Sequence, residues 1–114
     1  MCALIRIAIV EDDDAYRRQL VDFLKRYESE SGESFRLSLF SDGMEIVQDY
    51  RSEYDIILMD IEMRYMDGMT AAERIRKLDM EVVIIFITNM SQYVMKGYTV
   101  DAMDFVLKPI TYYA

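Results

Sequence analysis

The chain has 114 residues, the usual size of one domain, which argues against an enzyme built from two lobes. Hydrophobic residues make up 53% of it and charged residues 30%, a composition typical of a folded globular chain rather than a disordered one. The net charge of -8 argues against binding of DNA or RNA, and the lack of His together with a single Cys excludes histidine-based catalytic triads, histidine-ligated zinc and intrachain disulfides.

The sequence contains no recognisable targeting or membrane-spanning segment. Its first residues have neither a long apolar core nor a small-residue cleavage pattern. The longest uncharged apolar stretch, Val82 to Ile87, is far shorter than the ~20 residues of a membrane helix. We therefore expect a cytoplasmic protein without a membrane partner.

The first part of the chain is predicted to alternate strands and helices. Ile5 to Val10 is predicted to be a strand, and four acidic residues follow it. Apolar residues then recur at helical spacing from Tyr16 to Tyr27, which predicts a helix, with a loop over Glu28 to Ser34. The alternation of apolar and polar residues from Phe35 to Phe40 indicates a strand at the edge of a sheet.

The middle of the chain continues the pattern. A short helix reaching Tyr50 is predicted to be capped by Ser41 or Asp42. Two continuous apolar runs, Ile56 to Met59 and Val82 to Ile87, are typical of parallel strands that are covered on both faces.

Between these two strands, Thr70 is the predicted N-cap of a further helix. A weaker helix is predicted over Ser91 to Val100 and a fifth strand over Phe105 to Leu107. Right-handed crossovers would place such helices on both faces of one sheet, so the predicted fold class is α/β, with a doubly wound five-stranded parallel sheet.

In such sheets, ligands bind outside the carboxyl ends of the strands. The residues predicted there are Glu11, Asp12, Asp60, Thr88 and Lys108. Carboxylates gathered in one place repel one another unless a cation lies among them, and an all-oxygen ligand set suits Mg²⁺. A carboxylate such as Asp60 beside a metal ion can act as a nucleophile towards phosphorus. The acidic run after the first strand is equally well explained by the favourable interaction of acidic side chains with a helix N-terminus.

Five strings, in order along the chain, resemble the receiver domain of bacterial two-component response regulators. They are IAIVEDD (7–13), DIILMDIEM (55–63), MDGMTAAERIR (66–76), IIFITN (84–89) and AMDFVLKPI (102–110). The DIEM string and KPI are most similar to receivers attached to LytR/AgrA-type (LytTR) DNA-binding domains.

The resemblance implies a flavodoxin-like sheet with strand order 2-1-3-4-5 and a receiver domain over residues 1–114. It implies a phosphoacceptor signalling domain rather than an enzyme, which accepts a phosphoryl group on Asp60 from a sensor histidine kinase and controls an output, transcription regulation by a DNA-binding domain outside this chain. It implies Mg²⁺ bound by Glu11, Asp12, Asp60 and the backbone carbonyl of Glu62, phosphoryl contacts from Thr88 and Lys108, and a switch formed by Thr88 and Phe105.

Two departures from the family pattern affect these expectations. Arg64 and Tyr65 stand where the family commonly has Pro and Gly, which leaves the shape of that loop open. The residues after Pro109 are too few for a complete fifth helix, so we expect that helix to be missing or truncated. An apolar strip would then be exposed, and we expect self-association as a dimer or by exchange of elements.

Three other functions are alternatives to phosphoacceptor signalling. An unphosphorylated pseudo-receiver would act as an interaction module, and its usual sign is loss of the acceptor Asp or the Lys, both of which are present. A phosphatase of the haloacid dehalogenase type would need a DxDx(T/V) pattern, which Ala15 and Tyr16 break. Flavin binding would need a Ser/Thr/Gly-rich phosphate loop after the first strand, where this chain is acidic.

Overall fold

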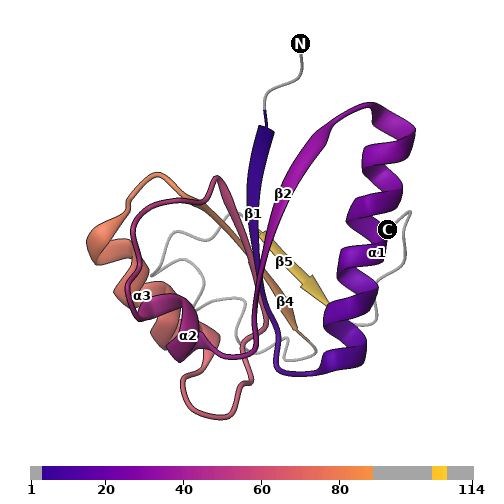
Figure 1. Ribbon diagram of the computed structural model, residues 1–114. Coiled ribbons are helices and arrows are strands. Elements are labelled where there is room, and N and C mark those ends of the chain that lie inside the picture. Colours follow the sequence, from indigo (N-terminus) through magenta and orange to yellow (C-terminus); the bar gives the residue numbers. More distant parts are fainter. Residues whose placement is uncertain (1–3, 89–103, 108–114) are drawn as a thin grey trace.

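A computed structural model describes residues 4–88 and 104–107 of the chain. The strands in this part are parallel and form one sheet in the order β2-β1-β3-β4-β5 (Figure 1). The predicted doubly wound α/β fold and its strand order are confirmed. The elements follow one another as β1 (Leu4–Val10), α1 (Asp14–Ser31), β2 (Ser34–Phe40), α2 (Gly43–Val47), β3 (Ile56–Met59), α3 (Gly68–Leu78), β4 (Val83–Thr88) and β5 (Asp104–Leu107).

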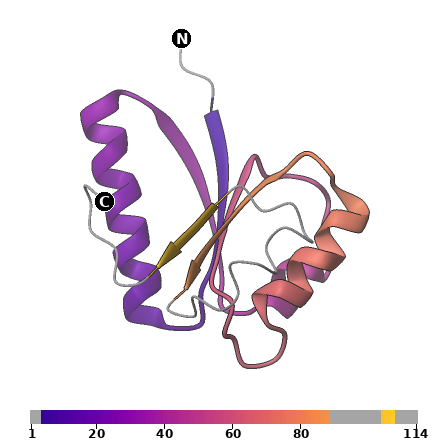
Figure 2. The ribbon, with the colours of Figure 1, turned by 180° about the vertical axis from the view of Figure 1, so that it is seen from behind.

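Helices cover both faces of this sheet. Figures 1 and 2 show α1 on one face and α2 with α3 on the other. Side chains along β1 alternate between the faces, so Ala8 and Val10 belong to the core beneath α2 and α3, whereas Ile7 and Ile9 pack with Leu20 of α1. β1 is therefore buried on both sides, and its carboxyl end lies between the carboxyl ends of β2 and β3.

The edge position predicted for β2 is confirmed, because β2 lies at one end of the strand order. The inner strands β3 and β4 are more deeply buried. The side chains of Ile57, Met59, Ile84 and Phe86 in these strands are all 0% exposed. Continuous apolar runs thus mark the strands that have neighbours on both sides.

Helix α1 extends further than its apolar periodicity predicts. It begins after Asp13, whose side chain accepts hydrogen bonds from the backbone N–H groups of Ala15 and Tyr16. It ends at Gly32, which has a left-handed φ of 79° and donates its N–H to the carbonyl of Glu28. The prediction of a loop starting at Glu28 was wrong, because the first residue suited to end the helix is the glycine.

The start of α3 also differs from its prediction. Thr70 lies inside the helix, and the N-cap is Asp67, whose carboxylate accepts the backbone N–H of Thr70 at 2.8 Å. Helix α2 is capped by Asp42, one of the two predicted candidates, and ends at Val47, before Tyr50. Asp is as effective a cap as Ser or Thr, so cap preference alone does not locate the first turn.

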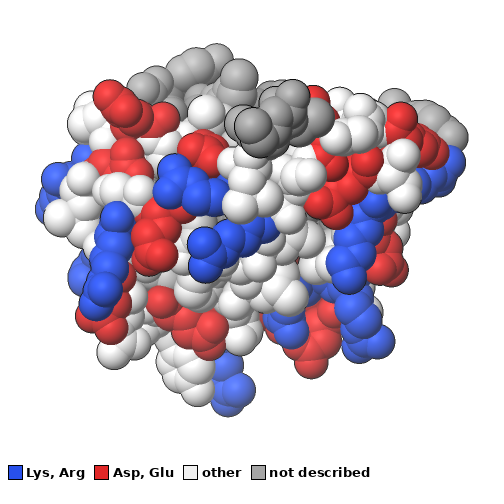
Figure 3. All heavy atoms as spheres, turned by 45° about the horizontal axis from the view of Figure 1, so that its top comes forward, with Lys and Arg blue, Asp and Glu red and all other residues white. Residues whose placement is uncertain are grey.

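Several predictions fall on residues outside the described ranges. These are the helix over Ser91 to Val100, the position of Lys108, and the missing or truncated fifth helix. Within the described ranges, no helix combines the length and hydropathy needed to cross a bilayer. At the edge where the strands begin, acidic and basic side chains are interspersed (Figure 3), and Arg6 pairs with Asp55 at 3.1 Å.

Candidate functional site

The carboxyl ends of β1 and β3 bring together side chains that are far apart in the sequence. Glu11 follows β1 and Asp60 follows β3, and each residue extends the ladder by one backbone hydrogen bond. The N–H of Asp60 donates to the carbonyl of Val10, and that of Glu11 donates to the carbonyl of Phe40, each at 3.0 Å. Carboxylate oxygens of Glu11, Asp12 and Asp60 all lie within 4.8 Å of one another. We call these three residues the acidic cluster.

The acidic cluster is largely removed from solvent. Glu11 is 1% exposed and Asp60 is 7% exposed, whereas Asp12 is exposed. Carboxylates held this close repel one another, and a divalent cation would relieve that repulsion. The ligand atoms are oxygens alone, from one exposed and two buried carboxylates, and such a set fits Mg²⁺ better than zinc or copper.

The rest of the acidic run serves helix α1. Asp13 caps the helix, and Asp14 forms an ion pair with Arg17. Arg17 also donates a 2.6 Å hydrogen bond to the backbone carbonyl of Glu11. Cation binding and helix stabilisation, the two interpretations of this acidic run, therefore apply to different residues. Glu11 belongs to the acidic cluster, whereas Asp13 and Asp14 stabilise the start of α1.

The carboxylate of Asp60 is oriented by the backbone of the next residue. Its Oδ1 accepts the N–H of Ile61 at 2.8 Å, and the carbonyl of Ile61 accepts the N–H of Gly68 at 2.7 Å. A Cβ on Gly68 would lie 2.2 Å from the carbonyl oxygen of Asp60, so a glycine is required there. The first turn of α3 thus packs directly against the residue that ends β3.

A further buried carboxylate, that of Asp42, had no predicted role beyond capping. Asp42 is 5% exposed, and it accepts the backbone N–H groups of Met44 at 2.9 Å, Tyr65 at 2.8 Å and Met66 at 2.9 Å. Burial alone would raise the pKa of Asp42, but these donors and the N–H of Arg64 outweigh it, so the pKa lies below its ordinary value. Nothing in the local sequence indicates the contact with Tyr65 and Met66, because it joins segments distant along the chain.

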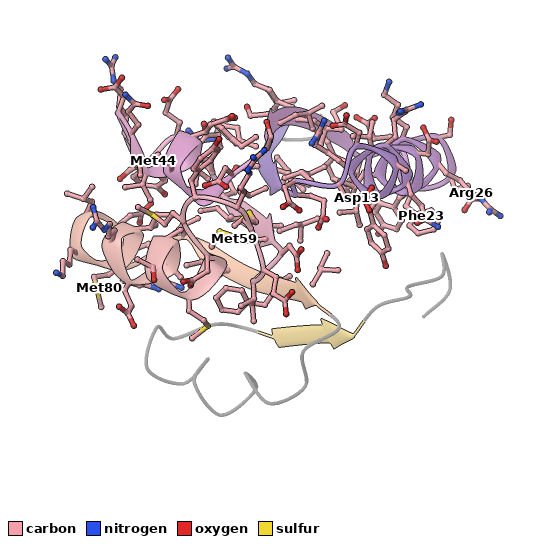
Figure 4. All side chains as sticks on the ribbon, turned by 90° about the horizontal axis from the view of Figure 1, so that it is seen from below. Asp13, Phe23, Arg26, Met44, Met59 and Met80 are labelled. Carbon is pink, nitrogen blue, oxygen red and sulfur yellow. The ribbon has the colours of Figure 1, made fainter. Side chains whose placement is uncertain are left out.

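The other predicted site residues are placed only by the strand or loop in which they lie. Thr88 ends β4, next to β3, and pairs in register with Leu107 of β5, while Phe105 pairs with Phe86. Glu62 is exposed and lies two residues after Asp60. Figure 4 views the molecule from the side on which the strands end, with Met59, the last residue of β3, near the centre. The roles predicted for these residues stay predictions.

Comparison with known proteins identifies the family. A family model described as response regulator receiver domain matches residues 7–113. The chain belongs to the response regulator receiver family. Similar proteins include the sensory transduction protein LytT of Bacillus subtilis, which is 31% identical over 108 residues, and the two-component response regulator ARR11 of Arabidopsis thaliana, which is 30% identical over 107 residues. These matches cover 93% of this receiver but only 43% of LytT and 20% of ARR11, so the chain spans less than half of either relative.

Among solved structures, this receiver is similar to the response regulator TrrA of Thermotoga maritima in complex with Mg²⁺ and BeF. The TM-score is 0.79 at 28% sequence identity, and the match covers 95% of this chain and 90% of TrrA. The receiver fold and its place in the signalling family are therefore shown.

Proposed function

We propose that this receiver accepts a phosphoryl group on Asp60 from the phosphohistidine of a sensor histidine kinase, in a Mg²⁺-dependent reaction in the cytoplasm. The observation that carries the proposal is the burial of Asp60 at the end of β3, with carboxylate oxygens of Glu11 and Asp12 within 4.8 Å of its own. A divalent cation among these carboxylates would offset their mutual repulsion, and phosphoryl transfer needs such a cation to neutralise charge.

In this reaction an oxygen of Asp60 attacks phosphorus while the bond from phosphorus to the imidazole nitrogen of the kinase breaks. An acyl phosphate forms, and the electron pair of the broken bond stays on the leaving imidazole. The hydrogen bond from Ile61 to Oδ1 orients the carboxylate for this attack. Glu11, Asp12, Asp60 and the backbone carbonyl of Glu62 would hold the metal ion, which when bound would neutralise charge on the phosphoryl oxygens.

Thr88 and Lys108 are proposed to contact the phosphoryl group. The hydroxyl of Thr88 and the ammonium group of Lys108 can donate hydrogen bonds to phosphoryl oxygens, so these contacts are possible in a chain without histidine. Thr88 and Phe105 are proposed to form the switch, in which Thr88 moves towards the phosphoryl group and Phe105 takes the vacated space. The adjacency of β4 and β5 supports this pairing.

The output of the switch is proposed to be transcription regulation by a LytR/AgrA-type DNA-binding domain outside residues 1–114. The similarity to LytT, and the share of LytT that the match leaves uncovered, support this proposal. Self-association of the domain, as a dimer or by exchange of elements, is proposed as well, with a sensor histidine kinase as the other protein partner.

Incubation with a small acyl phosphate and Mg²⁺, followed by intact mass measurement, tests the proposal. One phosphoryl adduct is expected on the wild-type chain and none on Asp60→Asn. A chain that never acquires the adduct would be a pseudo-receiver, and steady hydrolysis of unrelated phosphate esters without an adduct would indicate a phosphatase. Either result would contradict the proposed function.

A further inference from the structure

Asp42 is a buried carboxylate for which the proposed function has no use. Within residues 4–88 and 104–107, the buried polar or charged side chains are Glu11, Asp42 and Asp60. Two of these belong to the acidic cluster. The third lies at the start of α2 and contacts the connection between β3 and α3, which we call the 61–67 loop.

The carboxylate of Asp42 joins two segments through backbone donors from both of them. Its Oδ1 accepts the N–H groups of Met44 and Met66, each at 2.9 Å, and its Oδ2 accepts the N–H of Tyr65 at 2.8 Å. The segments pack closely here, because a Cβ on Gly43 would lie 2.6 Å from the carbonyl oxygen of Met66. The side chain that caps α2 therefore also holds the far end of the 61–67 loop.

The loop packs in the core at its ends and through partly buried Met63, and its other residues are exposed. Ile61 and Met66 are 1% and 6% exposed and pack in the core, while Glu62 and Tyr65 lie in solvent, Tyr65 with 74% of its surface exposed. The carbonyl of Ile61 also accepts the N–H of Gly68 at 2.7 Å. The exposed side chain of Tyr65 contributes little to holding this part of the loop, so the hydrogen bond from its N–H to Asp42 is a direct restraint on the backbone there.

The sequence of the loop makes this restraint necessary. Residues 62–66 include neither proline nor a β-branched residue, so nothing in the covalent structure limits their backbone angles strongly. Fixing each such residue costs conformational entropy, which contacts must offset.

We propose that Asp42 is a positioning residue for the phosphoacceptor site. By accepting hydrogen bonds from Tyr65 and Met66, it sets the conformation of the 61–67 loop and so prepares the backbone of Glu62 to bind the metal ion. This inference rests on the proposed function, in which the carbonyl of Glu62 is a metal ligand.

Two substitutions separate this role from capping of α2. Asp42→Asn keeps an oxygen for Met44 and Met66 but turns an amide N–H₂ group towards the N–H of Tyr65, where two donors then face each other. Asp42→Ala removes every contact. Asp67→Ala is the matched control, because it removes the cap of α3 beside the same loop and leaves Asp42 in place.

The experiment is an NMR titration of the metal-free protein with Mg²⁺, together with amide hydrogen exchange of Tyr65 and Met66. Asp42→Asn is expected to weaken Mg²⁺ binding about tenfold and to speed exchange at Tyr65, as substitutions behind metal ligands commonly do. Asp67→Ala is expected to lower stability while its Mg²⁺ affinity stays within about twofold of wild type.

Folded Asp42→Asn that binds Mg²⁺ as tightly as the wild type would overturn the inference and leave the proposed function standing. A wild-type chain that binds no Mg²⁺ would overturn the proposed function as well. If Asp42→Ala does not fold, the Asn variant decides the question by itself.

Discussion

The hydroxyl of Tyr50 donates a 2.8 Å hydrogen bond to Oδ2 of Asp79, the C-cap residue that follows α3. The other oxygen of Asp79 accepts the backbone N–H groups of Glu81 and Val82 at 3.0 and 3.1 Å. One carboxylate thus joins the segment before β3 to the turn that leads into β4. This contact lies at the end of α3 opposite to Gly68 and the acidic cluster.

Removal of the Tyr50 hydroxyl should weaken the fold and leave metal binding intact. Tyr50→Phe is expected to lower the free energy of unfolding by about 1 kcal/mol, because Asp79 loses a donor in a half-buried setting. Urea unfolding measures the loss. Tyr27→Phe, which removes a hydroxyl from a 49% exposed ring, is the control and should leave stability unchanged. Equal effects of the two substitutions would mean that the bond to Asp79 contributes nothing.

Stability should fall in acid through two carboxylates. Burial would raise the pKa of Asp42 and of Asp79, but their hydrogen-bond donors outweigh it, and both pKa values lie below the ordinary range. Each carboxylate therefore stabilises the fold above about pH 4, its unfolded value, and this contribution is lost as the pH falls through the lowered folded value. Urea unfolding between about pH 2 and pH 6 should show a smaller acid loss in Asp42→Asn and Asp79→Asn than in the wild type.

Asp60→Asn should abolish the phosphoryl adduct and stabilise the metal-free protein. The amide cannot act as the nucleophile, yet its oxygen can still accept the N–H of Ile61. One charge fewer in the acidic cluster relieves repulsion worth on the order of 1 kcal/mol. Thermal unfolding in a chelator should therefore show an equal or higher midpoint than wild type. A phosphoryl adduct that persists in this variant would refute the assignment of Asp60.

Neighbouring acidic residues should have opposite effects. Asp12→Ala is expected to weaken Mg²⁺ binding with little change in stability, because Asp12 is exposed and belongs to the acidic cluster. Asp13→Ala should do the reverse and cost about 1 kcal/mol, because Asp13 caps α1. Parallel Mg²⁺ titrations and urea unfolding compare the two variants. If both lost metal binding equally, the run would be only a diffuse acidic surface.

A methyl group at Gly68 should disturb both the fold and the site. The Cβ of Gly68→Ala would lie 2.2 Å from the carbonyl oxygen of Asp60, so α3 or the end of β3 must move. Such overpacking typically costs about 1 to 3 kcal/mol. Thr70→Ala, in the same first turn, is the comparison and should cost less. Urea unfolding should show a larger loss of unfolding free energy for Gly68→Ala than for Thr70→Ala.

The sequence predicts the sheet well because its signals are local. Continuous apolar runs mark the inner strands, alternation marks β2, and acidic residues directly after strands indicate that Glu11 and Asp60 meet once the strand order is known. Helix ends were less predictable. Asp67 and Thr70 are both residues that cap helices well, and the folded structure uses Asp67, one residue before the close contact of Gly68 with Asp60.

The second role of Asp42 could not be predicted in this way. As a residue before a short helix it is an ordinary cap, and its bonds to Tyr65 and Met66 exist only because the two connections meet in the folded sheet. A resemblance carries roles onto positions such as Thr88, Phe105 and Lys108, but their side chains fall outside the described part of the structure, and these roles stay predictions.

The placement of the acidic cluster also affects the order of events in folding. Glu11 and Asp60 follow strands that are separated along the chain by α1, β2 and α2, so no local segment can assemble the cluster. It forms only after β1 has paired with β3, a contact of large sequence separation that forms slowly. A cation that binds this cluster has no site on the unfolded chain, and it therefore stabilises the native state by mass action. Where the pairing is incomplete in the transition state, the cation slows unfolding and leaves the rate of folding unchanged.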